Sequence, residues 1–262
     1  MAIFMYKTKL LSDMLPAKPQ VLECPHCGGL QCISALMSGN TIGMTQWSDA
    51  KREAPMQPQP SLVMRCPHCR KYYFYEDKLI VGSCKTYYHS SWGKLSYASL
   101  KEALSQLQPT GHDETELRIM LIHAYNDLYG TMAPEDVPPH ERLYFERNAR
   151  KLIRLQPENK IFCAELHREL EEYDQALAIL NEVTGEDYIE NIAKQIALRA
   201  ERRDPRVFVL NDNGEHHESR IAVTVDDVVY KYDPKKDVER KRKSIVEWLR
   251  EKFSPTYEES EF

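Results

Sequence analysis

A tetrapeptide, Cys-Pro-His-Cys, occurs twice and constrains the N-terminal third of the chain more than any other feature. Its copies place one pair of cysteines at Cys24 and Cys27 and a second pair at Cys66 and Cys69. Two residues between the cysteines let both sulfurs turn toward one ion, with the amides of the tight turn pointing at them. Two such pairs supply four soft ligands, which suits tetrahedral zinc. We therefore predict one structural Zn²⁺ held by these four cysteines.

Short segments around the second pair have the composition of strands. Ser61–Arg65 leads into the pair and Lys71–Tyr75 leaves it, so the two segments predict a hairpin with the pair at its tip. Gly28 and Gly29 follow the first pair, where such turns often need a positive φ. These features resemble the zinc-ribbon family, in which two cysteine pairs on two hairpins share one zinc. The resemblance covers roughly residues 21–82 and implies a small β module.

The distance between the pairs departs from a compact ribbon. Residues 28–65 separate them, 38 in all, where about 15–20 are typical. The excess falls in a long inserted loop, 44–60, in which three prolines disfavour a regular element. Long ordered loops in small modules often have a function, and we take Trp47, Arg52 and Met56 as candidate partner contacts. The alternative is that the loop braces the module against the rest of the chain.

Other chemistry at the cysteine pairs is less consistent with the sequence. A thioredoxin-like redox motif uses one pair beside a βαβ pattern, which is not evident here. A catalytic zinc needs an open coordination position and a general acid or base, and the deaminase motif is not present. An iron–sulfur cluster on the same four thiolates stays open as an alternative.

The chain has seven cysteines, and no export signal is evident before them. This favours a reducing cytoplasm, in which disulfides are rare. We interpret Cys32 and Cys84 as buried thiols, with replacement of a metal ligand as the alternative, and Cys163 as part of a helical core. His26 and His68 lie inside the turns and are predicted to be exposed turn residues rather than ligands.

From about Leu95 the apolar residues take helical spacing. One helix is predicted from Asp113 or Thr115 to Gly130 and another from His140 to Leu155. Three more are marked by apolar positions, which are Phe162–Tyr173, Ala176–Val183 and Ile189–Ala200.

Two of these helices resemble a tetratricopeptide repeat. Ala164 occupies the position where a small residue lets paired helices approach, and Tyr173–Leu177 matches the turn and the start of the second helix. Residues 114–159 look like a degenerate copy that is about twelve residues too long. The resemblance implies a short helical bundle with a groove for a peptide or a partner helix.

The C-terminal segment mixes both kinds of element. Val207–Leu210 is a strand candidate, Asn211–Gly214 a turn, and two β-branched runs follow at Ile221–Val225 and Val228–Tyr232. A basic amphipathic helix is predicted over Asp237–Lys252. His216 and His217 are interpreted as an exposed polar turn rather than a metal site.

These patterns together predict an α+β chain in three parts. The parts are a zinc-ribbon domain over 1–94, a mostly α-helical tetratricopeptide-like bundle over 95–204, and a C-terminal β segment with its helix over 205–262. The formal net charge of −5 argues against a surface built throughout for nucleic acid or anionic lipid. No apolar run approaches the roughly 20 residues that span a bilayer. The order of the parts also resembles bacterial proteins, which implies a bacterial cytoplasm.

The sequence bears on three functional classes. The favoured one is a non-catalytic, zinc-stabilised adaptor that binds a protein partner through its helical domain. The alternative is nucleic-acid binding through the ribbon, for which Arg65, Arg70, Lys71 and Tyr73 are the candidate contacts. An enzyme is disfavoured because the sequence holds no Gly-rich phosphate loop, HExxH motif or Gly-x-Ser-x-Gly motif.

Overall fold

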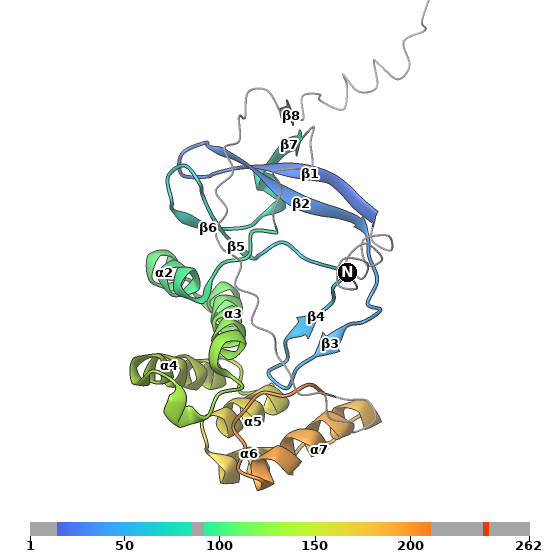
Figure 1. The fold of residues 1–262 in the computed structure, drawn as a ribbon, viewed down its shortest axis with the longest axis vertical. Helices are drawn as coiled ribbons and strands as arrows, with labels where there is room; N and C mark the ends of the chain where they lie inside the picture. The colour runs from blue at the N-terminus through green and yellow to red at the C-terminus, as the bar shows by residue number, and fades with distance from the viewer. Residues whose placement is uncertain (1–14, 85–91, 211–237, 241–262) are drawn as a thin grey trace, which may run out of the picture.

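The computed structural model describes residues 15–84, 92–210 and 238–240, and all structural statements below refer to them. Most strands lie in the N-terminal part, the α-helices follow them, and one short strand comes after the helices, so the chain is α+β (Figure 1). A small two-stranded insertion from the β region reaches down to the helices. No helix among the described residues is long and apolar enough to cross a membrane.

The largest sheet has four antiparallel strands. Its order is β2-β1-β7-β8, and the strands are β1 (Leu15–Glu23), β2 (Leu30–Ser38), β7 (Ile80–Cys84) and β8 (Val238–Arg240). Consecutive strand residues point to opposite faces, so Val21 and Leu22 of β1 enter two different apolar clusters. The cluster around Leu22 includes two of the metal-ligand candidates, Cys24 and Cys66.

A separate hairpin carries the second cysteine pair. Its strands are β5 (Val63–Arg65) and β6 (Tyr72–Phe74), which pair in register through Met64 and Tyr73. This confirms the hairpin predicted from the sequence. A short 3₁₀ turn, η1 (Asp77–Leu79), then leads into β7.

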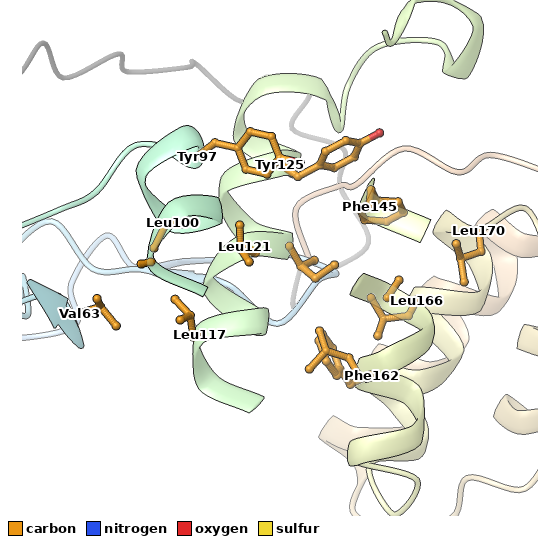
Figure 2. Close-up of a cluster of buried hydrophobic side chains, with 14 of the residues drawn as sticks. Val63, Tyr97, Leu100, Leu117, Leu121, Tyr125, Phe145, Phe162, Leu166 and Leu170 are labelled. Carbon is orange, nitrogen blue, oxygen red and sulfur yellow. The ribbon is translucent and has the colours of Figure 1, made fainter. Parts of the chain in front are cut away.

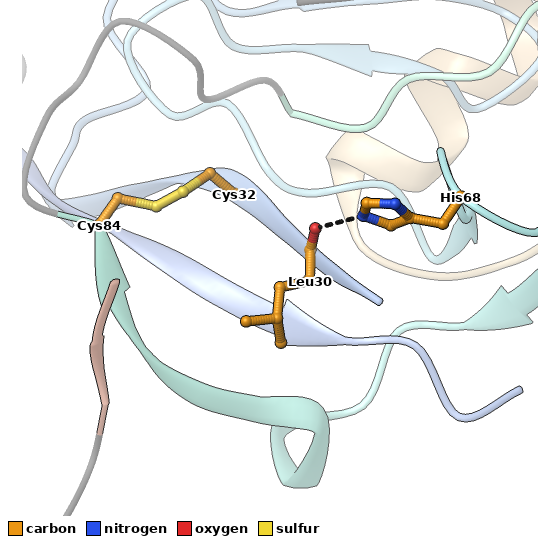
Figure 3. Close-up of a disulfide and its surroundings, with 4 residues drawn as sticks. All are labelled: Leu30, Cys32, His68 and Cys84. Carbon is orange, nitrogen blue, oxygen red and sulfur yellow. Dashed lines mark hydrogen bonds between the residues drawn. A yellow bond between two sulfur atoms is a disulfide. The ribbon is translucent and has the colours of Figure 1, made fainter. Parts of the chain in front are cut away.

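A disulfide joins Cys32 of β2 to Cys84 of β7, with the two Cα atoms 6.5 Å apart (Figure 3). Both residues are buried beside Val21 of the strand that lies between them in the sheet. The interpretation of Cys32 and Cys84 as plain buried thiols was therefore wrong, and neither replaces a metal ligand. The sequence could not show the pairing, because two cysteines 52 positions apart become neighbours only once β1 brings both strands to its sides.

The inserted loop packs against the helical region. It forms a two-stranded ribbon of β3 (Thr45–Gln46) and β4 (Arg52–Glu53) with Trp47, Ser48 and Asp49 buried at its tip. Backbone bonds join it to 208–210: the Ser48 amide donates to the Phe208 carbonyl and the Leu210 amide to the Gln46 carbonyl. The contacts are those of a brace between the two halves of the chain.

Six α-helices follow, each packed against the next. They are α2 (Tyr97–Leu107), α3 (Gly111–Tyr129), α4 (Pro139–Leu155), α5 (Lys160–Glu169), α6 (Tyr173–Leu180) and α7 (Asp187–Glu201), with the 3₁₀ turn η2 (Pro134–Asp136) before α4. Five of them were predicted to within a few residues; α2 was not. Ser96 caps α2 through its hydroxyl, and Asn159 caps α5 through its side-chain oxygen.

The main core lies between α2, α3, α4 and α5 (Figure 2). Tyr125 of α3 stacks on Phe145 of α4 with ring centroids 4.3 Å apart. Val63 and Tyr72 of the second hairpin join this cluster, and the Tyr72 hydroxyl donates to Glu102 of α2 at 2.7 Å. The β region and the helices therefore share one interior.

Buried charges lie where the inserted loop meets α3 and α5. The Arg168 guanidinium donates two hydrogen bonds, of 2.8 and 2.5 Å, to the Glu165 carboxylate. It also donates to the Asp204 carbonyl. The Asn126 amide donates to Glu169 and to Asp49 of the loop, both at 3.0 Å. Among the described residues, the buried side chains of the aspartate, glutamate, lysine and arginine types are thus three carboxylates and one guanidinium.

The C-terminal predictions fall mostly outside the described residues. Val207–Leu210 lies extended against the inserted loop, with a bridge between Val209 and Trp47. The helix predicted over Asp237–Lys252 was wrong at its start, because Val238–Arg240 is strand β8 paired with β7. Backbone pairing with a sheet edge outweighs the local helical spacing there. The predicted turn, the two β-branched runs and His216–His217 all lie outside the described residues.

The buried carboxylates predict that the stability of the protein depends on pH. Burial, with Glu165 and Asp49 nearby, raises the pKa of Glu169 well above its ordinary value. Between the unfolded and folded pKa values the native state binds the extra proton, so this group makes stability fall as pH rises. Glu169→Gln should remove that slope and raise the free energy of unfolding at pH 8 relative to wild type, as measured by urea denaturation from pH 6 to 8.

The matched control is Glu182→Gln, which changes an exposed carboxylate two residues after the end of α6. Its unfolding free energy should run parallel to wild type across the same pH range. If the unfolding free energy of Glu169→Gln also ran parallel to that of wild type from pH 6 to 8, the raised pKa of Glu169 would be contradicted.

The disulfide predicts a redox-dependent stability. It closes a loop of 52 positions, so its loss should lower the free energy of unfolding by about 2–4 kcal/mol. We expect this loss in metal-loaded protein on treatment with a phosphine reductant, and a similar loss in the Cys32→Ala/Cys84→Ala variant without reductant. A wild-type urea midpoint that the reductant leaves unchanged would show that the bond contributes nothing.

Candidate metal centre

Two turns bring four cysteine sulfurs together. Cys24 and Cys27 lie in the turn between β1 and β2, and Cys66 and Cys69 lie in the turn between β5 and β6. All four Sγ atoms lie within 4.8 Å of one another. Across the pairs, Cys24 Sγ is 3.8 Å from Cys69 Sγ and Cys27 Sγ is 3.6 Å from Cys66 Sγ. The predicted convergence of these four residues is confirmed.

These distances fit one metal ion at the centre. A tetrahedral shell with metal–sulfur bonds of about 2.3 Å has sulfur–sulfur edges of about 3.8 Å. Four protein thiolates complete such a shell and leave no position for water or substrate. The cluster can therefore hold a metal ion in a closed site.

The two turns have the same backbone construction. In the first, the Gly28 amide donates to the Cys24 carbonyl and the Cys24 amide to the Gly29 carbonyl, both at 2.9 Å. In the second, Arg70 and Lys71 take the places of the two glycines around Cys66, at 3.0 and 2.9 Å. The residue after each pair has a positive φ, +67° at Gly28 and +61° at Arg70.

Backbone amides inside the turns point at the sulfurs. The His26 amide donates to Cys24 Sγ at 3.4 Å, and the His68 and Cys69 amides donate to Cys66 Sγ at 3.4 and 3.5 Å. Amide hydrogens stabilise the thiolate form that a metal requires.

The two histidines fasten each turn to the opposite hairpin. His26 Nε2 lies 3.0 Å from the Tyr72 carbonyl, and His68 Nε2 lies 3.0 Å from the Leu30 carbonyl (Figure 3). A carbonyl only accepts, so Nε2 carries the hydrogen in both rings. The rings are exposed, as predicted, but sequence reasoning missed their role. Its signal was the histidine at the same position of both tetrapeptides.

Gly29 leaves the space that the His68 ring occupies. A Cβ on Gly29 would lie 2.4 Å from a carbon of that ring, so no other residue fits without displacing it. The two-glycine sequence after the first pair thus serves two needs, the positive φ at Gly28 and the close approach at Gly29.

The four thiols differ in acidity in the absence of a metal. Burial raises the pKa of Cys66 to about 12 and also raises the pKa of Cys24. The Lys71 backbone amide lowers the pKa of Cys69 to about 7. Metal binding must therefore displace protons from the buried thiols, which couples the site to pH.

Of the four candidate nucleic-acid contacts, the aromatic one is buried. Tyr73 is 3% exposed beneath the sulfur cluster, and its hydroxyl accepts a bond from Gln31 at 2.5 Å. Arg65 is half-buried, with its guanidinium 5.4 Å from the Tyr72 ring centroid. Arg70 and Lys71 are exposed at the second turn. The aromatic ring proposed for base stacking is therefore inaccessible.

The candidate partner contacts of the inserted loop are mostly interior. Trp47 is 4% exposed and Met56 is 8% exposed, whereas Arg52 lies at the surface. Two of the three side chains are thus unavailable to a partner, because they pack inside this chain. Cys163 is buried on α5, away from the sulfur cluster, and its thiol lies 3.2 Å from the Gln156 carbonyl.

Comparison with known proteins adds no family to this description: no protein-family model, curated protein or solved structure matches the chain significantly.

The paired turns predict opposite effects of two substitutions. Gly28→Ala forces a side chain into a left-handed conformation and should lower stability by about 1 kcal/mol. Arg70→Gly at the equivalent position relieves the same conformation and should be neutral or raise stability. Urea unfolding of the metal-loaded variants measures both. A loss of stability in Arg70→Gly equal to that in Gly28→Ala would contradict the equivalence of the turns.

Proposed function

We propose that the protein is a non-catalytic adaptor in which a single zinc ion stabilises the N-terminal module and the helical region binds a protein partner. The observation that carries the structural role of the metal is the closed set of four thiolates at Cys24, Cys27, Cys66 and Cys69. Zinc is the metal that four cysteines in two short turns most often bind in proteins. Because this shell has no open position, the metal is suited to stabilising the fold rather than to catalysis.

The helical part of the proposal has its own support. Helices α5 and α6 are joined by only residues 170–172 and pack closely, with Ala164 fully buried between neighbours. This close pairing supports the tetratricopeptide-like interpretation of the sequence, in which helical pairs present a surface to a peptide or helix.

Nucleic-acid binding is the second candidate, supported by Arg70 and Lys71 at the tip of the second turn. The burial of Tyr73 counts against it, because stacking on aromatic rings supplies much of the affinity for single strands. Charge alone would remain, and the chain is acidic as a whole.

The cytoplasmic location inferred from the sequence remains a prediction. The Cys32–Cys84 disulfide counts against it, because such bonds persist mainly in oxidising compartments.

Metal removal tests the stabilising role. Purified protein should contain one zinc ion per chain by elemental analysis and native mass spectrometry, and Cys66→Ser should contain none. Loss of the metal should unfold the N-terminal module, since binding energy of about 10 kcal/mol or more is coupled to folding in such sites. Cys163→Ser is the matched control and should retain the zinc. A metal-free wild type that remains folded would overturn the proposal.

The two functional candidates separate in binding assays. An adaptor should show no affinity for single-stranded RNA or DNA by fluorescence anisotropy at physiological salt. Nucleic-acid binding would instead weaken steeply with salt and decrease further in Lys71→Glu.

A further inference from the structure

The outward face of α4 carries positive charge and no exposed carboxylate. The helix lies at the outer edge of the helical region and packs its inner face into the main core through Phe145, Ala149 and Leu152 (Figure 1). Beyond the proline at its first position, every exposed side chain of α4 is basic or apolar. These residues, which we name the α4 stripe, are His140, Leu143, Arg147, Arg150 and Arg154.

The α4 stripe follows the helix axis. Its successive members are three, four, three and four residues apart. This alternation averages about 3.5 residues, the spacing at which the side chains of one helix stay in line with a second helix beside it. From His140 to Arg154 the helix rises about 21 Å at about 1.5 Å per residue. The stripe is therefore long enough to contact several turns of another helix.

Three arginines supply most of the charge of the α4 stripe. Arg150 forms an ion pair with Glu172 at 2.7 Å, and its side chain remains 49% exposed. Arg147 and Arg154 form no ion pair with any residue that the structure describes. The guanidinium groups of Arg147 and Arg154 are therefore available to the carboxylates of another molecule.

The two carboxylates of α4 already have counter-ions. Glu141 forms an ion pair with Lys101 of α2 at 2.7 Å, and Glu146 with Arg142 of the same helix at 3.3 Å. Neither of them therefore cancels the charge of the stripe. The chain as a whole has a formal net charge of −5, so a positive face on it is a local feature. Such a face attracts and orients an acidic partner.

We propose that the α4 stripe binds an acidic amphipathic helix of a partner protein, in which glutamates or aspartates repeat at intervals of three and four residues. A guanidinium can form two parallel hydrogen bonds to one carboxylate, which gives such pairs a defined geometry. Leu143, which is 46% exposed, adds an apolar contact. Because an isolated surface ion pair contributes little, the matched spacing of several pairs provides both affinity and selectivity.

A nucleic acid is the other anionic candidate, and the α4 stripe suits it less well. Its exposed residues include no aromatic ring. Tyr144, beside the stripe, is half-buried and has the Lys101 ammonium 5.3 Å from its ring centroid. Stacking on aromatic rings supplies much of the affinity for single strands, so phosphate contacts alone would remain.

This inference rests on the proposed adaptor function and specifies the chemistry of the partner. No residue of the α4 stripe belongs to the four-cysteine cluster, so its variants can be compared at full zinc occupancy. If zinc content and metal-dependent folding are as proposed while the stripe does not bind, the acidic-helix inference alone is overturned.

The test uses the full-length, zinc-loaded protein and two fluorescent synthetic peptides as long as α4. Both peptides have the same composition, rich in alanine and glutamine. One has its glutamates at alternating intervals of three and four residues, and its isomer has them spread around the helix. With equal helicity by circular dichroism, the first peptide should bind about fivefold or more tightly than the isomer by fluorescence anisotropy. Added salt should weaken its binding.

Arg147→Glu should weaken binding of the first peptide about threefold or more, because it replaces an attraction by a repulsion. The matched control is Arg202→Glu, which makes the same change of net charge at an exposed arginine just after α7. It should bind the peptide with nearly wild-type affinity. Zinc content and the thermal unfolding midpoint establish that both variants are folded.

Three results would overturn the inference: no binding of either peptide, equal binding of the two isomers, or equal weakening by Arg147→Glu and Arg202→Glu. Either kind of equality would indicate general charge attraction. A single-stranded RNA that binds more tightly than the first peptide, and loses binding in Arg147→Glu, would assign the stripe to nucleic acid instead. The comparison of the two isomers on wild type is decisive even if a variant fails to fold.

Discussion

The meeting of four cysteine sulfurs is the constraint on which the N-terminal half depends. The strands of the second hairpin have only three residues each, and two of the sulfurs, those of Cys24 and Cys66, are themselves part of the buried cluster with Leu22 and Ile33. Without an ion, the thiols of that cluster would remain protonated and weakly attracted. With an ion, the same atoms fix the relative position of both hairpins, and His26 and His68 secure the arrangement from the outside through the opposite carbonyls.

The inserted loop connects the metal-binding β region to the helical region. Because Trp47, Ser48 and Asp49 are buried against α3 and residues 207–210, the β region and the helices are joined by side-chain packing as well as by the chain. Lys51 adds bonds of 2.6 and 2.9 Å to Asp127 of α3. An insertion that looks like an excess in a compact metal module is thus the element that connects the module to its neighbour.

That connection places polar groups in the interior. The Asp49 carboxylate lies with Glu165 and Glu169 in the buried space between the loop, α3 and α5, where Arg168 is bonded to Glu165 and the Asn126 amide donates to both Asp49 and Glu169. Buried charge without full compensation is destabilising unless it is protonated or paired. Burial and the neighbouring carboxylates raise the pKa of Glu169, so protonation of Glu169 lowers the repulsion among these groups.

Local pattern was sufficient for much of this description. The repeated tetrapeptide determined the four metal-ligand candidates, and apolar periodicity determined five of the helices, because turn geometry and helical spacing depend on residues close together in the chain. It did not determine α2, whose Tyr97, Leu100 and Ala103 meet their partners only in the assembled core. The sequence by itself thus established a cysteine-rich β module followed by helices. Only the tertiary structure decided that Cys32 bonds Cys84, that Tyr73 and Trp47 are buried, and that the Asn126 amide donates to both Asp49 and Glu169, because each of these facts depends on strands and helices that are distant in the chain becoming neighbours in space.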